Sequence, residues 1–366
     1  MNQISPPRHP SLTSQSAVES RWNDENAECK LNVVLAPIVT MMLRHLLEAP
    51  SIVGRSLSRF PTRSRTARMC VARLSVCAFV ACALPNGATA ATTNTLPPWV
   101  CAHPDAIFAD GFQPAVAVVR LPSNGSGGAL GSVSRSVVVP GYGTHTIHLR
   151  VPPNYSPNRP MPLLLALHGQ AGAGAANNAA LSVRNTWGSI ADANGFIVVA
   201  PVATGGSGGW IAPPPNPSDY SIMAAAIADV EAAYNIDMSR RIGWGFSAGG
   251  HVMHDIMLND FGAPISIDTF AAYSVSAGVL EGFACSNPAN CTALVATAAR
   301  RIPLDIHVGN SDPLLPYATS DRTIFQANGW VLNNDLWFTT FTGGHTYAAS
   351  QLGEAWAHLC PFQVLP

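Results

Sequence analysis

Short apolar runs recur along the chain from about residue 145, and segments with helical spacing lie between them. A continuous apolar run of about five residues is typical of a strand buried on both faces of a parallel sheet. The predicted strands cover residues 146–151, 163–167, 196–200, 241–246, 270–274, 304–308 and 336–340. The predicted helices cover residues 180–193, 222–234, 252–257, 323–328 and 352–359. This alternation predicts an α/β fold with a mostly parallel central sheet and helices on both faces.

The first ninety residues have a different character. Arginines precede an apolar run over residues 74–84, and small residues follow it up to Ala90. A basic region, a short apolar core and a small-residue cleavage site are the three parts of a signal peptide. We therefore expect a signal peptide over residues 69–90, cleavage near Ala90 and a secreted or periplasmic product. The run is too short to span a bilayer, so no stable membrane anchor is predicted. Residues 1–68 are interpreted as a non-structural leader or a mis-assigned start.

Composition separates a flexible part of the remaining chain from a folded one. Residues 91–140 are rich in Thr, Pro, Ser and Gly, which predicts a flexible segment. Residues 141–366 are expected to form one α/β domain, since the chain as a whole is 48% hydrophobic and 11% charged, which allows a large core. Residues 91–366 carry ten arginines against sixteen acidic residues. A mildly acidic chain without a basic patch argues against nucleic acid as a partner, and the oligomeric state stays open.

Four cysteines follow the predicted cleavage site: Cys101, Cys285, Cys291 and Cys360. An even number in an exported chain suggests two disulfides, and three pairings are possible. Turn-forming residues lie between Cys285 and Cys291, which favours a bond between these two. Cys101 and Cys360 would then tie the two ends of the domain together. Free buried cysteines are the alternative, and an oxidising compartment disfavours them.

The stretch Gly245-Phe-Ser247-Ala-Gly249 joins a predicted strand to a predicted helix. A G-x-S-x-G sequence in this context is the signature of a nucleophile elbow. The turn is so sharp that the residues two before and two after the serine need almost no side chain, and the hydroxyl stands clear of the sheet. A glycine-rich turn with a surface serine has the same sequence, so the interpretation depends on partners elsewhere in the chain.

A nucleophilic serine needs a base and an acid that orients the base. His345 lies in a glycine loop just past the strand over residues 336–340, and Asp312 follows the strand over residues 304–308. Both positions are at the carboxyl ends of strands, where open α/β sheets carry their sites. For Asp312 alone, a turn-forming aspartate before proline is the alternative. The order Ser247, Asp312, His345 is the order that the α/β-hydrolase fold uses.

Two backbone N–H groups are candidates for an oxyanion hole, those of Ala248 and Gln170. Ala248 follows the serine, and Gln170 follows the dipeptide His-Gly at the end of the strand over residues 163–167. Trp210 and Tyr220 lie in or near a Gly- and Pro-rich loop expected above the sheet. Either could form a wall of the substrate site, or could be a structural aromatic.

Five motifs together resemble those of the secreted polyhydroxybutyrate depolymerases and the feruloyl and acetylxylan esterases, the family-one carbohydrate esterases. They lie within roughly residues 140–360 and are Leu167-His-Gly169, Trp187 with Gly195-Phe-Ile-Val-Val199, Gly245-Phe-Ser-Ala-Gly249, Gly309-Asn-Ser-Asp312-Pro with Pro316-Tyr317, and Gly343-Gly-His345-Thr. The resemblance implies an α/β-hydrolase catalytic domain, a triad of Ser247, Asp312 and His345, and hydrolysis of carboxylic esters without a metal or cofactor. Many members have a cysteine in place of Gln170, which leaves the disulfide layout open. The short segment after His345 leaves binding to an insoluble polymer open.

The sequence therefore predicts a secreted serine esterase that needs no cofactor and acts on a polymeric or plant-cell-wall ester. One alternative is a prolyl-oligopeptidase-like serine peptidase on the same fold. The other is a non-catalytic surface-binding protein on a hydrolase scaffold, which the intact order of the three residues disfavours. The acyl and alcohol parts of the substrate are not identified by the sequence.

Overall fold

The computed structural model describes residues 92–95, 101, 120–211, 217–259 and 265–365. The predicted signal peptide and the residues before it lie outside the described residues, so both stay predictions. Within the described part, no helix is both long and apolar enough to cross a bilayer.

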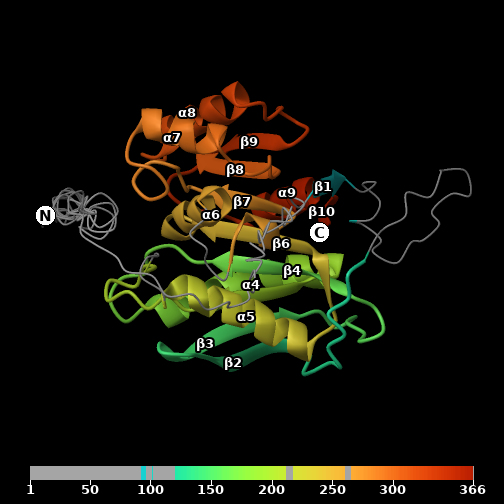
Figure 1. The fold of residues 1–366 in the computed structure, drawn as a ribbon. Coiled ribbons are helices and arrows are strands. Elements are labelled where there is room, and N and C mark those ends of the chain that lie inside the picture. The colour runs from blue at the N-terminus through green and yellow to red at the C-terminus, as the bar shows by residue number, and fades with distance from the viewer. Residues whose placement is uncertain (1–91, 96–100, 102–119, 212–216, 260–264, 366) are drawn as a thin grey trace, which may run out of the picture. The chain divides into compact units, whose positions relative to one another are not determined.

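An eight-stranded sheet forms the centre of the described domain (Figure 1). Its strands follow one another across the sheet in the order β2-β3-β5-β4-β6-β7-β8-β9. They are β2 (Gly131–Val139), β3 (Gly143–Val151), β4 (Met161–Leu167), β5 (Ile197–Pro201), β6 (Ile236–Phe246), β7 (Ala272–Ser276), β8 (Leu304–Gly309) and β9 (Leu336–Phe341). The strands from β5 to β9 run parallel, and the hairpin of β2 and β3 joins them antiparallel. The predicted α/β class with a mostly parallel sheet is thereby confirmed.

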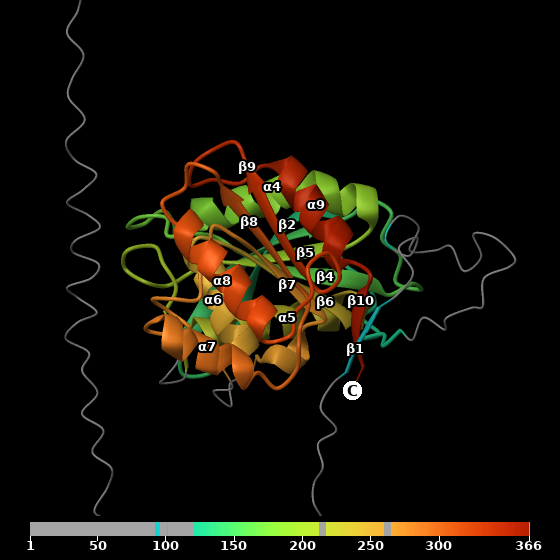
Figure 2. The ribbon, with the colours of Figure 1, turned by 90° about the horizontal axis from the view of Figure 1, so that it is seen from above.

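Helices cover both faces of this sheet (Figure 2). On one face lie α4 (Ala176–Asn194) and α9 (Ala349–Leu359), and on the other α5 (Asp219–Ala233), α6 (Ala248–Leu258), α7 (Pro288–Ala296) and α8 (Leu315–Ala327). Side chains of a strand alternate between the faces. In β4, Leu163 and Leu165 join the core under α5 and α6, whereas Leu164 and Ala166 join the core under α4 and α9. All seven residues of β4 are therefore buried, as its continuous apolar run predicts.

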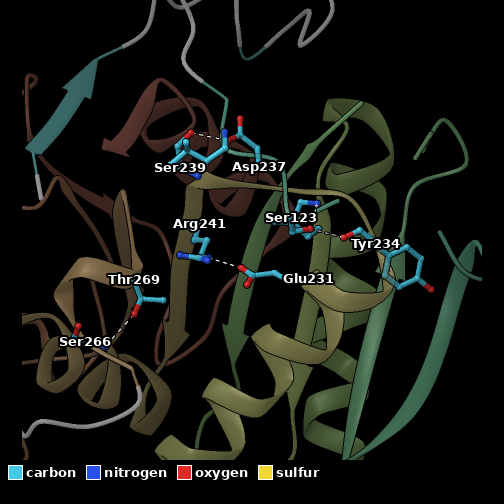
Figure 3. Close-up of polar contacts among 10 residues, drawn as sticks. Ser123, Glu231, Tyr234, Asp237, Ser239, Arg241, Ser266 and Thr269 are labelled. Atoms are coloured by element: carbon cyan, nitrogen blue, oxygen red, sulfur yellow. Dashed lines mark hydrogen bonds and ion pairs between the residues drawn. The ribbon is translucent and has the colours of Figure 1, made fainter. Parts of the chain in front are cut away.

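Polar contacts fix the first half of β6 (Figure 3). Arg241 donates from Nε to Glu231 of α5 at 2.5 Å. Asp237 accepts the hydroxyl of Ser239 at 2.6 Å and is itself fully buried. Just before β7 lies the short 3₁₀ helix Ile267–Thr269, whose first turn is stabilised by a capping box of side-chain and backbone groups. The strand that carries the serine motif at its far end is thus anchored at its beginning.

The two ends of the described domain lie side by side. Strand β1 (Thr92–Thr95) pairs antiparallel with β10 (Phe362–Leu365) in a separate two-stranded sheet. Among the described residues there are two disulfides, Cys101–Cys360 and Cys285–Cys291. These are the two pairs that the sequence favours, and the first of them closes the domain beside the β1–β10 sheet.

One strand lies where the sequence predicts a flexible segment. β2 falls within residues 91–140 and pairs with β3 along all nine of its residues. Three serines at positions 132, 134 and 136 alternate in β2 with Val133, Arg135 and Val137, so the strand has few of the apolar residues that mark the others. Val137 and Val139 face the core, whereas Val138 between them is 70% exposed. The domain therefore begins before residue 141.

Two helices differ from the prediction because their first turns contain proline. Helix α8 begins at Leu315 with Pro316 in its first turn, eight residues before the predicted start. Helix α7, which was not predicted, begins at Pro288, and the Asn287 side chain caps it by accepting the N–H of Asn290. Proline at the first helical positions is favourable because its missing N–H has no partner there in any case.

Candidate active site

Ser247 stands on a strained turn between β6 and α6. Its backbone has φ of 50° and ψ of −119°, a conformation that residues other than glycine rarely adopt. Strain of this kind costs of the order of 1–3 kcal/mol and persists only where the surroundings impose it. A Cβ on Gly245 would lie 2.1 Å from the carbonyl oxygen of Gly249, and one on Gly249 would lie 2.5 Å from that of Leu167. Both glycines of the motif are therefore required by close backbone contacts.

His345 and Asp312 complete a hydrogen-bonded chain with this serine. The Ser247 hydroxyl lies 2.8 Å from His345 Nε2, and His345 Nδ1 lies 2.9 Å from Asp312 Oδ2. The Asp312 side chain is fully buried, whereas 37% of the His345 side chain is exposed. A substrate can thus approach the imidazole and the hydroxyl but not the carboxylate. The three predicted residues meet at the carboxyl ends of β6, β8 and β9.

The contacts of Asp312 determine which nitrogen of His345 carries the proton. Asp312 Oδ1 accepts the backbone N–H of Leu314 at 2.8 Å, so the carboxylate is held in one orientation. A carboxylate can only accept, which places the imidazole proton on Nδ1. Nε2 is then the free base that faces the Ser247 hydroxyl.

Backbone contacts join the loop that carries Asp312 to the loop that carries His345. The N–H of Asn310 donates to Phe341 O, and that of Ser311 donates to Gly343 O, each at 2.8 Å. The loops approach so closely that a Cβ on Gly309 would lie 2.3 Å from a carbonyl oxygen of the other loop. The loop that carries Asp312 and the loop that carries His345 are therefore held together by backbone hydrogen bonds.

The loop after β4 contacts the elbow from the other side. A Cβ on Gly169 would lie 2.9 Å from the Phe246 ring and 3.1 Å from Ser247 Cβ. Gln170, the next residue, is exposed. Ala248 is the first residue of α6, whose free N–H groups favour negative charge. The two candidate oxyanion donors thus belong to segments that meet at the serine.

His168 fixes the peptide between Gly169 and Gln170. Its Nε2 accepts the N–H of Ala203 at 3.2 Å, so its proton lies on Nδ1, 2.6 Å from the Gly169 carbonyl oxygen. Burial lowers the pKa of His168, which keeps the ring neutral and this tautomer in place. In a planar trans peptide the C=O and N–H point in opposite directions. With the Gly169 carbonyl held by His168, the Gln170 N–H faces away from that imidazole.

Trp210 supports this loop from behind. It is buried, its Nε1 donates to the His168 carbonyl at 2.7 Å, and its ring lies 4.7 Å from the His168 ring. Asp219 at the start of α5 accepts the N–H groups of Thr204 and Ile211, which closes the loop that carries Trp210. Trp210 is therefore mainly a structural aromatic, with 9% of its surface left for contact with a ligand.

The expectation that Tyr220 lines a substrate wall is corrected. None of its surface is exposed, and its hydroxyl donates a short hydrogen bond to Asp255 of α6. Burial raises the pKa of Asp255 to about 6. The sequence placed Tyr220 near the loop above the sheet, but it lies in the first turn of α5 and faces the core.

Three residues near the site, Phe246, His168 and Asp219, make contacts that the sequence does not indicate. Phe246 lies 5.1 Å from the His345 ring and 4.8 Å from the Tyr347 ring, measured between centroids. For His168 the sequence shows only the dipeptide His-Gly, and not its bond to the Gly169 carbonyl. The sequence around Asp219 indicates an acidic residue in the first turn of a helix. It does not indicate that Asp219 also orders the loop that carries Trp210.

Comparison with solved structures identifies the fold. A ferulic acid esterase matches with a TM-score of 0.50 and 16% identity, over 64% of this chain and 99% of that one. The feruloyl esterase module of Clostridium thermocellum, solved with sinapinate, matches with a TM-score of 0.51 and 19% identity, over 68% and 96%. The chain is an α/β-hydrolase by fold. Within this fold, Ser247 follows β6, and Asp312 and His345 follow β8 and β9.

Sequence comparison agrees with the resemblance found in the motifs. No family model matches the chain. A probable feruloyl esterase C of Aspergillus flavus is 33% identical over 199 residues, which are 52% of this chain and 64% of that protein. A bifunctional acetylxylan esterase/xylanase of Neocallimastix patriciarum is 32% identical over 174 residues, 47% of this chain and 22% of that protein. The match to the Aspergillus protein thus spans less than two thirds of its length. The resemblance of this α/β-hydrolase to feruloyl and acetylxylan esterases is confirmed.

Proposed function

We propose that the protein is a serine esterase that hydrolyses carboxylic esters through an acyl-enzyme. The observation that carries the proposal is the hydrogen-bonded chain from Asp312 through His345 to the hydroxyl of Ser247. A neutral imidazole whose Nε2 faces a hydroxyl is a general base in position. The relatives named as esterases support ester hydrolysis over peptide hydrolysis or binding without catalysis.

In the first half of the reaction, His345 Nε2 takes the proton of Ser247 while Oγ attacks the ester carbonyl. The carbonyl carbon becomes tetrahedral, and its oxygen takes the negative charge. The imidazolium then gives its proton to the alkoxy oxygen as the carbon–oxygen bond breaks, and the alcohol leaves. Asp312 stays ionised throughout and stabilises the imidazolium. The acyl group remains bound to Ser247.

In the second half, water takes the place of the alcohol. His345 removes a proton from the water, whose oxygen attacks the acyl-enzyme, and the proton returns to Ser247 Oγ as the acid leaves. Both tetrahedral intermediates place an oxyanion near the N–H groups of Ala248 and Gln170. Removal of one such donor typically costs about 10²–10³ in kcat.

The relatives indicate the substrate class. The relatives are named as a feruloyl esterase and an acetylxylan esterase. We therefore propose that the substrates are feruloyl or acetyl esters of plant-cell-wall polysaccharides, in preference to polyhydroxyalkanoates. We also propose export of the mature chain after cleavage near Ala90. The two disulfides support an oxidising compartment. N-terminal sequencing of the secreted chain tests the export, and a mature chain that retains Arg68 would contradict it.

A substrate panel and one substitution test the function. Initial rates on p-nitrophenyl acetate, methyl ferulate, acetylated xylan, a polyhydroxybutyrate suspension and a chromogenic peptide separate the candidate activities. A fluorophosphonate should label wild-type protein one to one and leave Ser247→Ala unlabelled. Ser320→Ala, on the exposed surface of α8, is the matched control and should label normally. Ester hydrolysis by Ser247→Ala at a tenth of the wild-type rate would place the nucleophile elsewhere.

A further inference from the structure

A second group of titratable side chains lies between β8 and α9, apart from the triad at the strand ends. Asp305 and His307 project from β8 toward the face that α9 covers, and His358 comes from α9. His307 Nε2 lies 2.7 Å from Asp305 Oδ2, and His358 Nδ1 lies 3.6 Å from the same oxygen. Each of the three residues offers one ligand atom, and these ligand atoms all lie within 4.8 Å of one another. Among the residues that the structure describes, this is the group that brings together enough donors for a metal ion.

The polar atoms of this group are incompletely satisfied. Asp305 and His307 are 0% and 1% exposed. Asp305 Oδ1 and His307 Nδ1 are buried without a hydrogen-bond partner. In the described part of the chain, Asp305 has imidazoles as its ion-pair partners and no arginine. A buried carboxylate with an unpaired oxygen costs free energy, which a bound cation would offset.

We propose that Asp305, His307 and His358 bind a divalent transition-metal ion, with Zn²⁺ the preferred occupant. One carboxylate oxygen and two imidazole nitrogens are ligands that zinc takes at about 2.0–2.2 Å in tetrahedral sites. In such a site neighbouring ligand atoms are roughly 3.3 Å apart, as those bond lengths require. The spacings of 2.7 and 3.6 Å lie on either side of that value. Calcium and magnesium prefer sets of oxygen ligands, so the two imidazoles disfavour both.

Glu354 and Trp337 flank His358 in the structure. Glu354 precedes His358 by four residues on α9, so the two side chains lie on the same helix face. Its carboxylate is exposed and contacts the Thr339 hydroxyl at 3.4 Å, and either this carboxylate or solvent completes the site. Trp337 stacks on His358 with ring centroids 4.8 Å apart and planes 11° from parallel, which orients the imidazole. The His358 side chain is 24% exposed, whereas its Nδ1, which faces Asp305, is buried without a hydrogen-bond partner.

The ion would have a structural role. It would tie β8 to α9, the helix that ends beside the Cys101–Cys360 disulfide. Because the unfolded chain lacks the assembled site, the free energy of binding adds to the free energy of unfolding. The proposed esterase chemistry uses none of these three residues, so the two proposals stand or fall separately.

Metal uptake by the intact protein tests the site. After dialysis against EDTA, Zn²⁺ is titrated in competition with a chromophoric chelator, and Co²⁺ binding is followed by its visible absorption. We expect one ion per chain, a tetrahedral Co²⁺ spectrum and a higher melting temperature with Zn²⁺. His358→Ala and Asp305→Asn should each lose the one-to-one uptake and the rise in melting temperature. His345→Ala, which removes the exposed imidazole of the triad, should keep both.

Three results would overturn the proposal. The first is a wild-type chain that takes up no Zn²⁺ after EDTA treatment, which would make the group a bare ion pair. The second is uptake that survives His358→Ala. The third is uptake lost in His345→Ala, which would place the ion on the triad. If Asp305→Asn fails to fold, His358→Ala decides, because His358 lies on the partly exposed side of α9.

Discussion

Replacing Asp312 with asparagine should cost far more activity than so small a change suggests. The carboxylate accepts two N–H groups, that of Leu314 at Oδ1 and Nδ1–H of His345 at Oδ2. An asparagine has one acceptor and one donor in the same place. If its oxygen stays with Leu314, its NH₂ faces His345 Nδ1 and forces the proton to Nε2. The imidazole can then no longer take the Ser247 proton.

The opposite orientation of the asparagine offers little relief. It would restore the bond to His345 but turn the NH₂ toward the partly buried N–H of Leu314, so that two donors would face each other. The charge that stabilises the imidazolium is lost in both orientations. The same change in a serine protease of unrelated fold lowers kcat about 10⁴-fold. We therefore expect a loss of about 10³–10⁴ in kcat, or roughly 4–5.5 kcal/mol in the barrier.

Initial rates on p-nitrophenyl acetate measure this loss, with circular dichroism and melting temperature as checks of the fold. Asp335→Asn is the matched control, because Asp335 lies in the turn before β9 and also accepts a backbone N–H. It should keep the wild-type rate. Asp312→Ala, which lets His345 choose its tautomer, should be no worse than Asp312→Asn. Retention of more than about a tenth of the activity by Asp312→Asn would refute the argument from the tautomer.

Three further predictions concern residues around the site and in the fold. His168→Phe removes the hydrogen bond that orients the Gln170 peptide, so kcat should fall about 10²-fold with KM little changed. A weakening of substrate binding, seen as a rise in KM as large as the fall in kcat, would contradict this. Asp321 lies in α8, and burial raises its pKa from 3.8 to about 7. The folded chain therefore holds this proton more tightly than the unfolded chain does. The resulting contribution to the free energy of unfolding is full below pH 3.8 and is lost as the pH rises through 7. Urea unfolding of Asp321→Asn should thus show a gain of the order of 4 kcal/mol over wild type at pH 8.5 and almost none at pH 4, whereas equal curves at both would contradict it. Changing Cys101 and Cys360 to serine should lower the free energy of unfolding by about 5 kcal/mol, because the bond spans 259 residues, against about 2 kcal/mol for the bridge that spans six.

The parts of the site that the sequence predicts are those imposed by local backbone geometry. The turn at Ser247 leaves no room for a Cβ two residues away on either side, so the glycines mark it in the sequence. Asp312 and His345 follow apolar runs directly, and the edge of a parallel sheet brings such positions together. For these three residues, the strand pattern and the order along the chain already contain the arrangement.

The parts that the sequence does not predict depend on packing between distant segments. The tautomer of His168 is set by the N–H of Ala203, which lies 35 residues away. Tyr220 of α5 is buried with its hydroxyl bonded to Asp255 of α6, 35 residues away, a contact with no local signal. Asp305 and His358 meet only because α9 folds back over β8. In each case the residue type was visible, but its partner was not.

The pairing of β1 with β10 determines how the domain would respond to a pulling force. Thr92 pairs with Leu365 and Thr95 with Phe362, so a force applied at Thr92 and Leu365 loads one pair of this small sheet at a time. Such unzipping needs less force than sliding whole strands past each other, but it ends at the covalent Cys101–Cys360 bond. The bond would then carry the tension, and the eight-stranded sheet would stay unloaded. If the protein were attached to a surface through Thr92 and Leu365, a pulling force would therefore not change the strand ends where Ser247 lies.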